Sequence, residues 1–187
     1  DDGSSDETLT VVRNWVSKNA IPITVLTQRN KGAGAARNKG ISAASSEWIM
    51  FLDSDDIYTP NAVETFYTAA QQYPDIKWIG ADFAVTDASF EQEISASLRD
   101  RQKVRSVLEE AFRSNRYLVL DNPAPIFLDV MLTWTGAVAV KRDLLLSVVG
   151  FKESLRRAQD THLWIRLATR AAFLFVPKRV ALYRQRS

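Results

Sequence analysis

The sequence contains no cysteine and a single histidine, His162. The absence of cysteine excludes disulfide bonds and metal sites that use thiolate ligands. One imidazole cannot form a zinc site that needs several histidines, and a lone histidine is more often a residue of a helix face than a member of a Ser-His-Asp triad. We therefore expect any bound metal ion to be held by oxygen atoms.

The chain also lacks an excess of charge of one sign. Its 187 residues include 24 Lys and Arg and 22 Asp and Glu, so the formal net charge is only +2. Proteins that bind nucleic acids usually concentrate positive charge, so we expect small ligands and no nucleic-acid partner. The length and the hydrophobic fraction of 46% are those of one compact domain.

Long hydrophobic runs are absent as well. The longest candidate, Ile126 to Val140, is interrupted by Asp129 and falls short of the roughly 18 residues of a membrane span. We predict no transmembrane segment in this chain. The sequence begins at Asp1, without methionine, in the loop-like stretch Asp-Asp-Gly-Ser-Ser-Asp, which suggests a fragment of a longer protein.

Apolar segments and helical patterns alternate along the first half of the chain. Ser4 and Glu7 have the spacing of a capping box. The expected elements after it are a helix to Lys18, a strand at Ile23–Leu26, a Gly/Ala-rich segment at Lys31–Ala44, a strand at Trp48–Leu52, a helix from Pro60 to Tyr73 and a strand at Trp78–Phe83. Such alternation predicts an α/β fold with a mostly parallel sheet flanked by helices. Because a strand normally precedes the first helix of such a fold, we expect the first strand of the sheet to be missing from the chain.

The second half is less regular. Glu91 to Asn115 is polar and expected to be helical. The remaining expected elements are a strand at Ala137–Val140, helices at Leu144–Val148 and Asp160–Thr169, and strands at Phe173–Val176 and Val180–Tyr183.

Three carboxylates follow the apolar segment Trp48–Leu52 directly, at Asp53, Asp55 and Asp56. They are expected at the carboxyl edge of the sheet, where open α/β sheets bind ligands. A divalent cation would relieve their repulsion, and oxygen ligands favour Mg²⁺ or Mn²⁺. A solvated acidic turn before the Pro60 helix explains the same residues, since acids are favourable near a helix amino terminus. Taken alone, the cluster leaves both interpretations open.

The segment Asn30 to Asn38 combines small residues with cations. Its glycines and alanines allow close backbone approach, and Lys31 and Arg37 could meet a diphosphate. The spacing is neither that of a Walker loop nor that of the dinucleotide fingerprint. A helix packed tightly on a sheet gives the same composition, and this second interpretation is favoured when the segment is taken alone.

The order of these motifs is more specific. Asp-Asp-Gly-Ser-Ser-Asp, Asn-Lys-Gly-x-Gly-x-Ala-Arg-Asn and Phe-Leu-Asp-Ser-Asp-Asp, in this order, resemble the family 2 glycosyltransferases, whose fold is GT-A. Farther on, Trp134-Thr135-Gly136-Ala137, Val149-Gly150-Phe151 and Gln159-Asp160 are similar to the acceptor side of that family. The resemblance implies a single catalytic domain over 1–187, with a donor-binding half at 1–90 and an acceptor-side half at 91–187.

Roles for individual residues follow from this resemblance. It makes Asp160 the catalytic base, although Asp160 could also cap the following helix. On the donor side it assigns Asp2 to the nucleobase or ribose, Lys31 and Arg37 to the diphosphate, Asp53 to the ribose or metal, and Asp55 to the metal as principal ligand, with Mn²⁺ or Mg²⁺ bound. On the acceptor side it assigns Trp134, Gly136 and Gln159, where Gln159 replaces the usual glutamate of the family. Trp134 and Trp164 fit a sugar-stacking surface or the core, and Arg166 is expected to form a structural ion pair.

The resemblance implies an inverting transfer of a sugar from a nucleotide-diphosphate sugar, UDP-linked by expectation, to a hydroxyl acceptor. The acceptor would be a glycan, a lipid-linked glycan or another hydroxyl compound, in polysaccharide or glycoconjugate synthesis. We expect this reaction in the cytoplasm, including the inner face of the membrane. The family's strand that covers the nucleobase is expected to be absent, so a non-catalytic sugar-nucleotide or carbohydrate-binding fragment is the main alternative. Metal-dependent phosphotransfer is a third hypothesis, because haloacid-dehalogenase-like phosphatases use a similar Asp-x-Asp cluster. It is disfavoured because Ile57 stands where that pattern has Thr or Val, two places after the second Asp.

Overall fold

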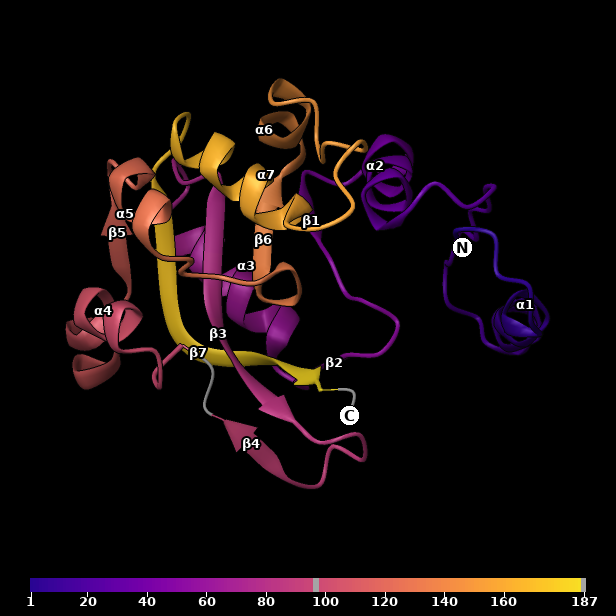
Figure 1. Cartoon of the computed structure of the whole chain (residues 1–187), viewed down its shortest axis with the longest axis horizontal. Helices are drawn as coiled ribbons and strands as arrows, with labels where there is room; N and C mark the ends of the chain where they lie inside the picture. The colour runs from indigo at the N-terminus through magenta and orange to yellow at the C-terminus, as the bar shows by residue number, and fades with distance from the viewer. Residues whose placement is uncertain (96–97, 186–187) are drawn as a thin grey trace.

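A single mixed sheet forms the centre of the molecule (Figure 1). The computed structural model describes residues 1–95 and 98–185, and within these residues the sheet has seven strands. The main path runs β1 (Trp48–Met50), β6 (Val138–Lys141), β3 (Trp78–Thr86), β7 (Phe173–Arg184) and β2 (Ile57–Tyr58). Two further strands pair beside this path, β4 (Glu93–Ser95) with β3 and β5 (Leu118–Leu120) with β7.

The two longest strands, β3 and β7, form the apolar centre of the sheet. They run parallel, and every residue of β3 except Val85 is buried. A small residue makes this packing possible, because a Cβ on Gly80 would lie 2.5 Å from the Phe173 ring. The Trp78 ring centroid lies 4.6 Å from that of Phe173 and 4.7 Å from that of Phe127. Aromatic packing around Trp78 therefore joins β3 to β7 and to α5.

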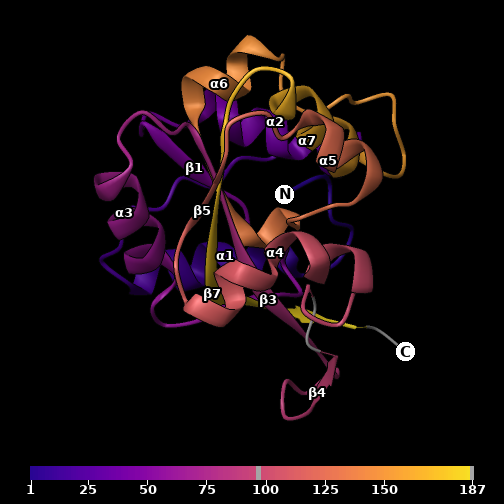
Figure 2. The same cartoon turned by 90° about the vertical axis from the view of Figure 1, so that its left-hand side faces the viewer.

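Helices cover both faces of the sheet. Figure 2 shows α3 (Ala62–Gln72) on one side of β3 and β7, and α4 (Gln102–Ser114), α5 (Ala124–Asp129) and α7 (Gln159–Ala168) on the other. The helices α2 (Ala33–Ala43) and α6 (Arg142–Ser147) lie near each other, and the 3₁₀ turn η1 (Thr135–Ala137) leads into β6. None of the helices in the described ranges combines the length and the hydrophobicity of a membrane span.

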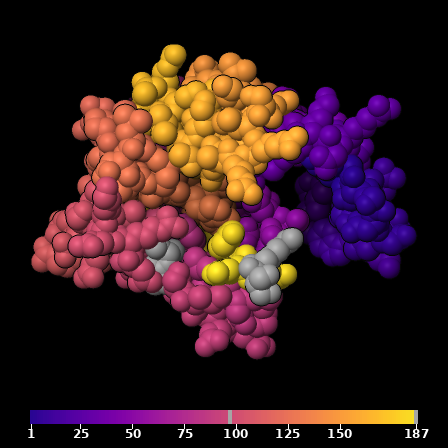
Figure 3. Space-filling model, viewed as in Figure 1, coloured from indigo at the N-terminus to yellow at the C-terminus, as the bar shows by residue number. Residues whose placement is uncertain are grey.

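The first helix, α1 (Thr8–Lys18), stands apart from these layers at one side of the molecule (Figures 1 and 3). None of its residues is buried, and Trp15 is 49% exposed. The chain on either side of α1 is held by hydrogen bonds: the Asp1 amino group donates to the Leu26 carbonyl at 2.7 Å, and the Gln28 amide donates to the Asp1 carbonyl at 3.0 Å. Polar contacts therefore join this part of the chain to the loop before α2.

The α/β architecture with helices on both faces is confirmed, but the prediction of a mostly parallel sheet is wrong for the described residues. Only β3 and β7 pair in parallel, and the other five pairings are antiparallel. The predicted strand at Ile23–Leu26 pairs with no strand in the part of the chain that the structure describes. Its backbone meets Asp1 instead, and β6, β5 and β2 join the sheet in the antiparallel sense.

Most other predicted elements occur where the sequence predicts them, with three differences. The capping box is wrong: the Ser4 hydroxyl bonds to the Asp1 carboxylate, and Asp6 accepts from the first helical amide, that of Thr8, at 3.1 Å. The two predicted carboxyl-terminal strands form one strand, β7, which continues through Pro177. The Glu91–Asn115 segment contains β4 before α4, and its residues 96–97 lie outside the described residues.

Candidate active site

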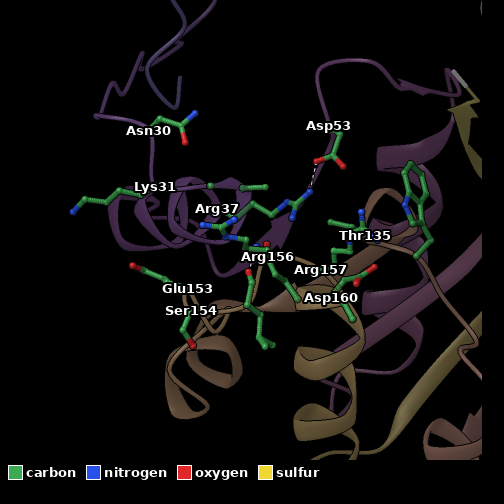
Figure 4. A pocket seen from close by; sticks show the side chains of 16 residues that line it. Asn30, Lys31, Arg37, Asp53, Thr135, Glu153, Ser154, Arg156, Arg157 and Asp160 are labelled. Carbon is green, nitrogen blue, oxygen red and sulfur yellow. Dashed lines mark hydrogen bonds and ion pairs between the residues drawn. The ribbon is translucent and has the colours of Figure 1, made fainter.

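A cavity of about 700 Å³ lies where α2, the turn after β1 and the segment before α7 meet (Figure 4). Lys31 belongs to the loop before α2, Arg37 to α2, Asp53 to the turn after β1 and Asp160 to the first turn of α7. All four line this charged cavity. The fold therefore brings together residues that are up to 129 positions apart in the sequence and that were predicted to act in one site.

The start of α2 depends on glycine at two positions. Gly32 has a φ of 90°, a conformation that favours glycine. Gly34 is buried against α7, since a Cβ there would lie 2.9 Å from Oε1 of Gln159. The small residues of this segment thus pack tightly, against α7 at Gly34, and Gly32 and Ala33 also line the charged cavity, while a contact with a diphosphate stays a prediction.

Asp2 holds the loop before α2 and is not among the residues that line the charged cavity. Its Oδ1 accepts from Nε2 of Gln28 at 2.8 Å and from the Lys31 amide at 2.9 Å, and its Oδ2 accepts from the Gly32 amide at 2.7 Å. The hydrogen bond from Gln28, followed by those from the loop, lowers the pKa of Asp2. Its assignment to the nucleobase or ribose stays a prediction.

Arg37 and Asp53 form an ion pair in the cavity wall. Nη2 of Arg37 lies 2.5 Å from Oδ1 of Asp53, and the guanidinium also lies over the Phe151 ring, 5.4 Å from its centroid. The two side chains are 18% and 36% exposed. Arg37 is therefore held on two sides, with its charge directed toward Asp53 at the edge of the cavity.

The turn after β1 is closed by Asp56. Its amide donates to the Asp53 carbonyl at 3.1 Å, and its Oδ1 accepts from the Arg184 amide at 2.9 Å, so the turn is tied to the end of β7. Burial, and then the charges of Asp55 and Asp53, raises the pKa of Asp56 to about 6. Asp56 is therefore a structural residue of the turn.

Asp53 and Asp55 are the residues of this turn that could hold a divalent cation. Their charges act on Asp56, so negative charge is crowded here and a cation would relieve it. In 1–95 and 98–185 the structure shows no cluster of three or more His, Cys, Asp or Glu suited to a metal. Mg²⁺ is commonly bound by one or two carboxylates and completed by substrate phosphates. Two aspartates thus fit an ion that binds together with a diphosphate.

Asn38 joins the α2 motif to the segment after α6. Its Oδ1 accepts from the Phe151 amide at 2.7 Å, and its Nδ2 donates to the Phe151 carbonyl at 2.8 Å and to Oε1 of Glu153 at 2.9 Å. Gly150 has a φ of 58°, and a Cβ there would lie 2.4 Å from Oδ1 of Asn38. The expected ion pair of Arg166 is wrong, because this guanidinium donates to the carbonyls of Val148 and Gly150. These contacts fix the segment that leads to Asp160.

Asp160 lies in the first turn of α7 and is half-buried. Its Oδ1 accepts from the Thr161 amide at 2.8 Å, while the N-cap position is occupied by Ala158. Asp160 also lines a second cavity of about 330 Å³, so its carboxylate lies where the two cavities meet. The predicted helix-cap role of Asp160 is therefore wrong, and its role as catalytic base stays a prediction.

The second cavity, which we call the aromatic cavity, is lined by Phe83, Trp134 and Tyr183. The Trp134 ring centroid lies 5.2 Å from that of Phe83 and 5.2 Å from that of Tyr183, and Trp134 also lines the charged cavity. Gly136 lies beneath this ring, because a Cβ there would lie 2.2 Å from it. Trp164, 1% exposed and stacked on Trp78, is a core residue at the cavity wall.

Several residues that line the two cavities are absent from the sequence-based prediction, among them Arg156, Arg157, Phe83 and Tyr183. The adjacent arginines carry a signal, because they directly precede the Gln159-Asp160 motif. Phe83 and Tyr183 carry none, since a strand aromatic looks the same in a sequence whether it lines a cavity or fills a core.

Relatives of this chain are glycosyltransferases. Residues 1–129 match the family described as glycosyl transferase family 2. The chain is 34% identical over 104 residues to the putative glycosyltransferase EpsH of Bacillus subtilis. The matched residues cover 54% of this chain and 30% of that protein. It is 23% identical over 175 residues to an uncharacterized glycosyltransferase of Haemophilus influenzae, covering 92% of this chain and 52% of that protein. The chain thus spans about half or less of the length of these relatives.

Two solved structures share the fold. One is Staphylococcus aureus TarS 1-349 in complex with UDP-GlcNAc, with a TM-score of 0.72 and 17% identity, covering 100% of this chain and 48% of that chain. The other is the mannosyltransferase PcManGT from Pyrobaculum calidifontis in complex with GDP-Man and Mn²⁺, with a TM-score of 0.66 and 20% identity, covering 99% and 46%. This chain therefore has the GT-A fold and belongs to glycosyl transferase family 2.

Proposed function

We propose that the charged and aromatic cavities form the active site of an inverting glycosyltransferase, which transfers a sugar from a nucleotide-diphosphate sugar to a hydroxyl acceptor. One observation carries this proposal: Asp160 lines both cavities. A donor in the charged cavity and an acceptor in the aromatic cavity would meet at this carboxylate.

Asp160 is the general base in this proposal. Its carboxylate takes the proton of the acceptor hydroxyl while that oxygen forms a bond to the anomeric carbon of the donor sugar. The bond between the anomeric carbon and the diphosphate oxygen breaks, and the nucleoside diphosphate leaves with the electron pair. Attack on the face opposite the leaving group inverts the configuration. A half-buried carboxylate at the junction of two cavities supports this role.

The donor side is assigned to Asp2, Lys31, Arg37 and Asp53. Lys31 and Arg37 neutralise the diphosphate, Asp53 orients Arg37 through their ion pair, and Asp2 contacts the nucleobase or ribose. Asp55, with Asp53, would hold Mn²⁺ or Mg²⁺, which when bound stabilises the negative charge on the departing diphosphate. The Mn²⁺ in the PcManGT complex supports a divalent ion here.

The substrates are proposed from chemistry and from the relatives. The TarS complex with UDP-GlcNAc supports a UDP-linked sugar, and the GDP-Man complex gives GDP as the second nucleotide to test. The acceptor would be a glycan, a lipid-linked glycan or another hydroxyl compound in polysaccharide or glycoconjugate synthesis, and Trp134 would place it. The resemblance puts Gln159 on the acceptor side, but it lines the charged cavity and not the aromatic one, so we place it on the donor side. Because nucleotide sugars are made in the cytoplasm, we place the reaction there, at the inner face of the membrane for a lipid-linked acceptor.

Two assays on the purified chain test this proposal. Isothermal titration with UDP or GDP in the presence of MnCl₂ should show binding, and a nucleotide-release assay with UDP and GDP sugars and a panel of acceptors should show turnover. Binding without release for any acceptor would favour the non-catalytic sugar-nucleotide-binding alternative. The absence of binding to either nucleotide would contradict both.

A further inference from the structure

The turn before α7 brings two arginines to the charged cavity. Arg156 and Arg157 line its wall between Arg37 and Asp160 (Figure 4). Within the described residues neither arginine forms an ion pair, whereas Arg37 is paired with Asp53. Lys31 likewise forms none in the described part of the chain. The wall therefore carries positive charge that an anionic ligand would neutralise.

Gln159 closes this turn with its side chain. Nε2 of Gln159 donates to the Leu155 carbonyl at 2.5 Å. This hydrogen bond closes a turn that contains Arg156 and Arg157. The side chain also lies against Gly34, where a Cβ would be 2.9 Å from its Oε1. A glutamate at this position would place an acceptor oxygen against the acceptor carbonyl of Leu155, and this contact would be repulsive. The turn thus depends on the amide that distinguishes this chain from the usual glutamate of the resembled motif.

The backbone of the turn needs such a closure. Ala158 has a φ of 54°, in the left-handed region that non-glycine residues adopt at a cost. Its carbonyl accepts from the His162 amide at 3.0 Å, which joins the turn to α7. The side-chain bond from Gln159 to Leu155 holds the other end. A change at Gln159 should therefore move Arg156 and Arg157 and leave α7 in place.

We infer that Gln159 is a positioning residue that holds Arg156 and Arg157 against the two phosphates of the nucleotide donor. Planar guanidinium groups bind phosphate oxygens through paired, charge-assisted hydrogen bonds, and two adjacent groups match the two phosphates of a nucleoside diphosphate. The inference rests on the proposed function, since it places the donor in the charged cavity. It adds a second set of cations to Lys31 and Arg37.

The arginines are tested by comparing UDP with UMP, which lacks the second phosphate, by isothermal titration at fixed MnCl₂. For Arg156→Ala and Arg157→Ala we expect UDP affinity to fall about tenfold each, and UMP affinity to fall much less. Arg170→Ala is the matched control, because Arg170 is exposed at the end of α7 and lines neither cavity. UDP affinities within twofold of wild type for both cavity variants would overturn the inference.

The role of Gln159 is tested in two backgrounds. Gln159→Glu and Gln159→Met should each lower UDP affinity about as much as one arginine substitution. In the Arg156→Ala/Arg157→Ala background they should cause no further loss, because Gln159 acts through the arginines. An equal loss in both backgrounds would contradict this role. Gly34→Ala is an independent variant that leaves Gln159 itself unchanged. Its Cβ would displace the flexible end of the Gln159 side chain, so it should lower UDP affinity as the Gln159 variants do.

The outcomes separate this inference from the proposed function. If the wild-type chain binds neither UDP nor GDP, the proposed function fails. If the wild-type chain binds UDP and the arginine and Gln159 variants bind it equally well, only the inference fails. Circular dichroism establishes that each variant is folded, and Gln159→Met or Gly34→Ala decides the question if Gln159→Glu does not fold.

Discussion

The charged cavity and the aromatic cavity differ in kind, although they share Asp160 and Trp134. The charged cavity is formed by α2, the turn after β1 and the turn before α7. Its wall presents the charged side chains of Lys31, Arg37, Asp53, Arg156 and Arg157. The aromatic cavity is formed largely by residues of the sheet and of the segment before η1, and it presents several rings together with Arg101, Thr133 and Thr161. Under the proposed function, the donor would be recognised mainly by charge and the acceptor mainly by aromatic rings. Substitutions that affect the two cavities separately can therefore break or sharpen this division.

The largest effect is expected for Asp55→Ala, on the charged side. Removal of the principal ligand should eliminate Mn²⁺-dependent turnover, a loss of more than about 1000-fold, because the charge of the departing diphosphate would lack its stabilising ion. Nucleotide release measured across a MnCl₂ titration checks this. Asp75→Ala, at an exposed acid after α3, serves as the control. Metal-dependent turnover that persists in Asp55→Ala would refute the assignment of Asp55.

Asp160→Asn should lower turnover without weakening the binding of the donor or of the acceptor. We expect turnover to fall by about 10² to 10⁴, as for the loss of a general base, with donor and acceptor binding within about twofold of wild type. Steady-state kinetics combined with UDP titration separates these quantities. Near-wild-type turnover would show that another group accepts the proton.

On the aromatic side, Tyr183→Ala should raise the Michaelis constant of the acceptor about fivefold to tenfold, because one ring of the wall is lost, and leave that of the donor unchanged. Trp134→Ala should raise both constants, since Trp134 lines both cavities. Tyr67→Ala, at a tyrosine that is 64% exposed on α3, is the matched control. A rise in the donor constant alone for Tyr183→Ala would reverse the assignment of the two cavities.

The smallest effect concerns stability and not turnover. Burial raises the pKa of Asp56 from 3.8 to about 6, so its ionised form destabilises the fold above that pH. Asp56→Asn should therefore be more stable than wild type at pH 7, by on the order of 2 kcal/mol, and this advantage should disappear as the pH falls from about 6 to about 4. Urea unfolding with EDTA present measures it. An advantage independent of pH would show that Asp56 is not the group that titrates.

Local patterns were sufficient for most elements and for four residues of the charged cavity. Lys31, Arg37, Asp53 and Asp160 belong to motifs whose order along the chain is informative, and they line one cavity. The fold class was predictable for the same reason. The direction of strand pairing was not, because it depends on which strands meet in space: Ile23–Leu26 has the composition of a strand but pairs with no strand in the described residues.

Tertiary contacts decided the remaining differences. Arg166 has the spacing of an ion-pair partner on a helix, but the carbonyls of Val148 and Gly150 lie within its reach only after α6 and α7 pack together. Gln159 carries no sign in the sequence that its amide closes a turn or that Gly34 lies against it. A residue type reports its own chemistry, and its partners come from the fold.

The most direct test of a donor in the charged cavity is a crystal structure of the chain with UDP and MnCl₂. We expect the diphosphate to lie beside Arg37, between the turn at Asp53–Asp55 and the turn before α7, with Mn²⁺ on Asp55. Nucleotide bound in the aromatic cavity, or Mn²⁺ bound away from Asp55, would contradict the division of substrates between the two cavities.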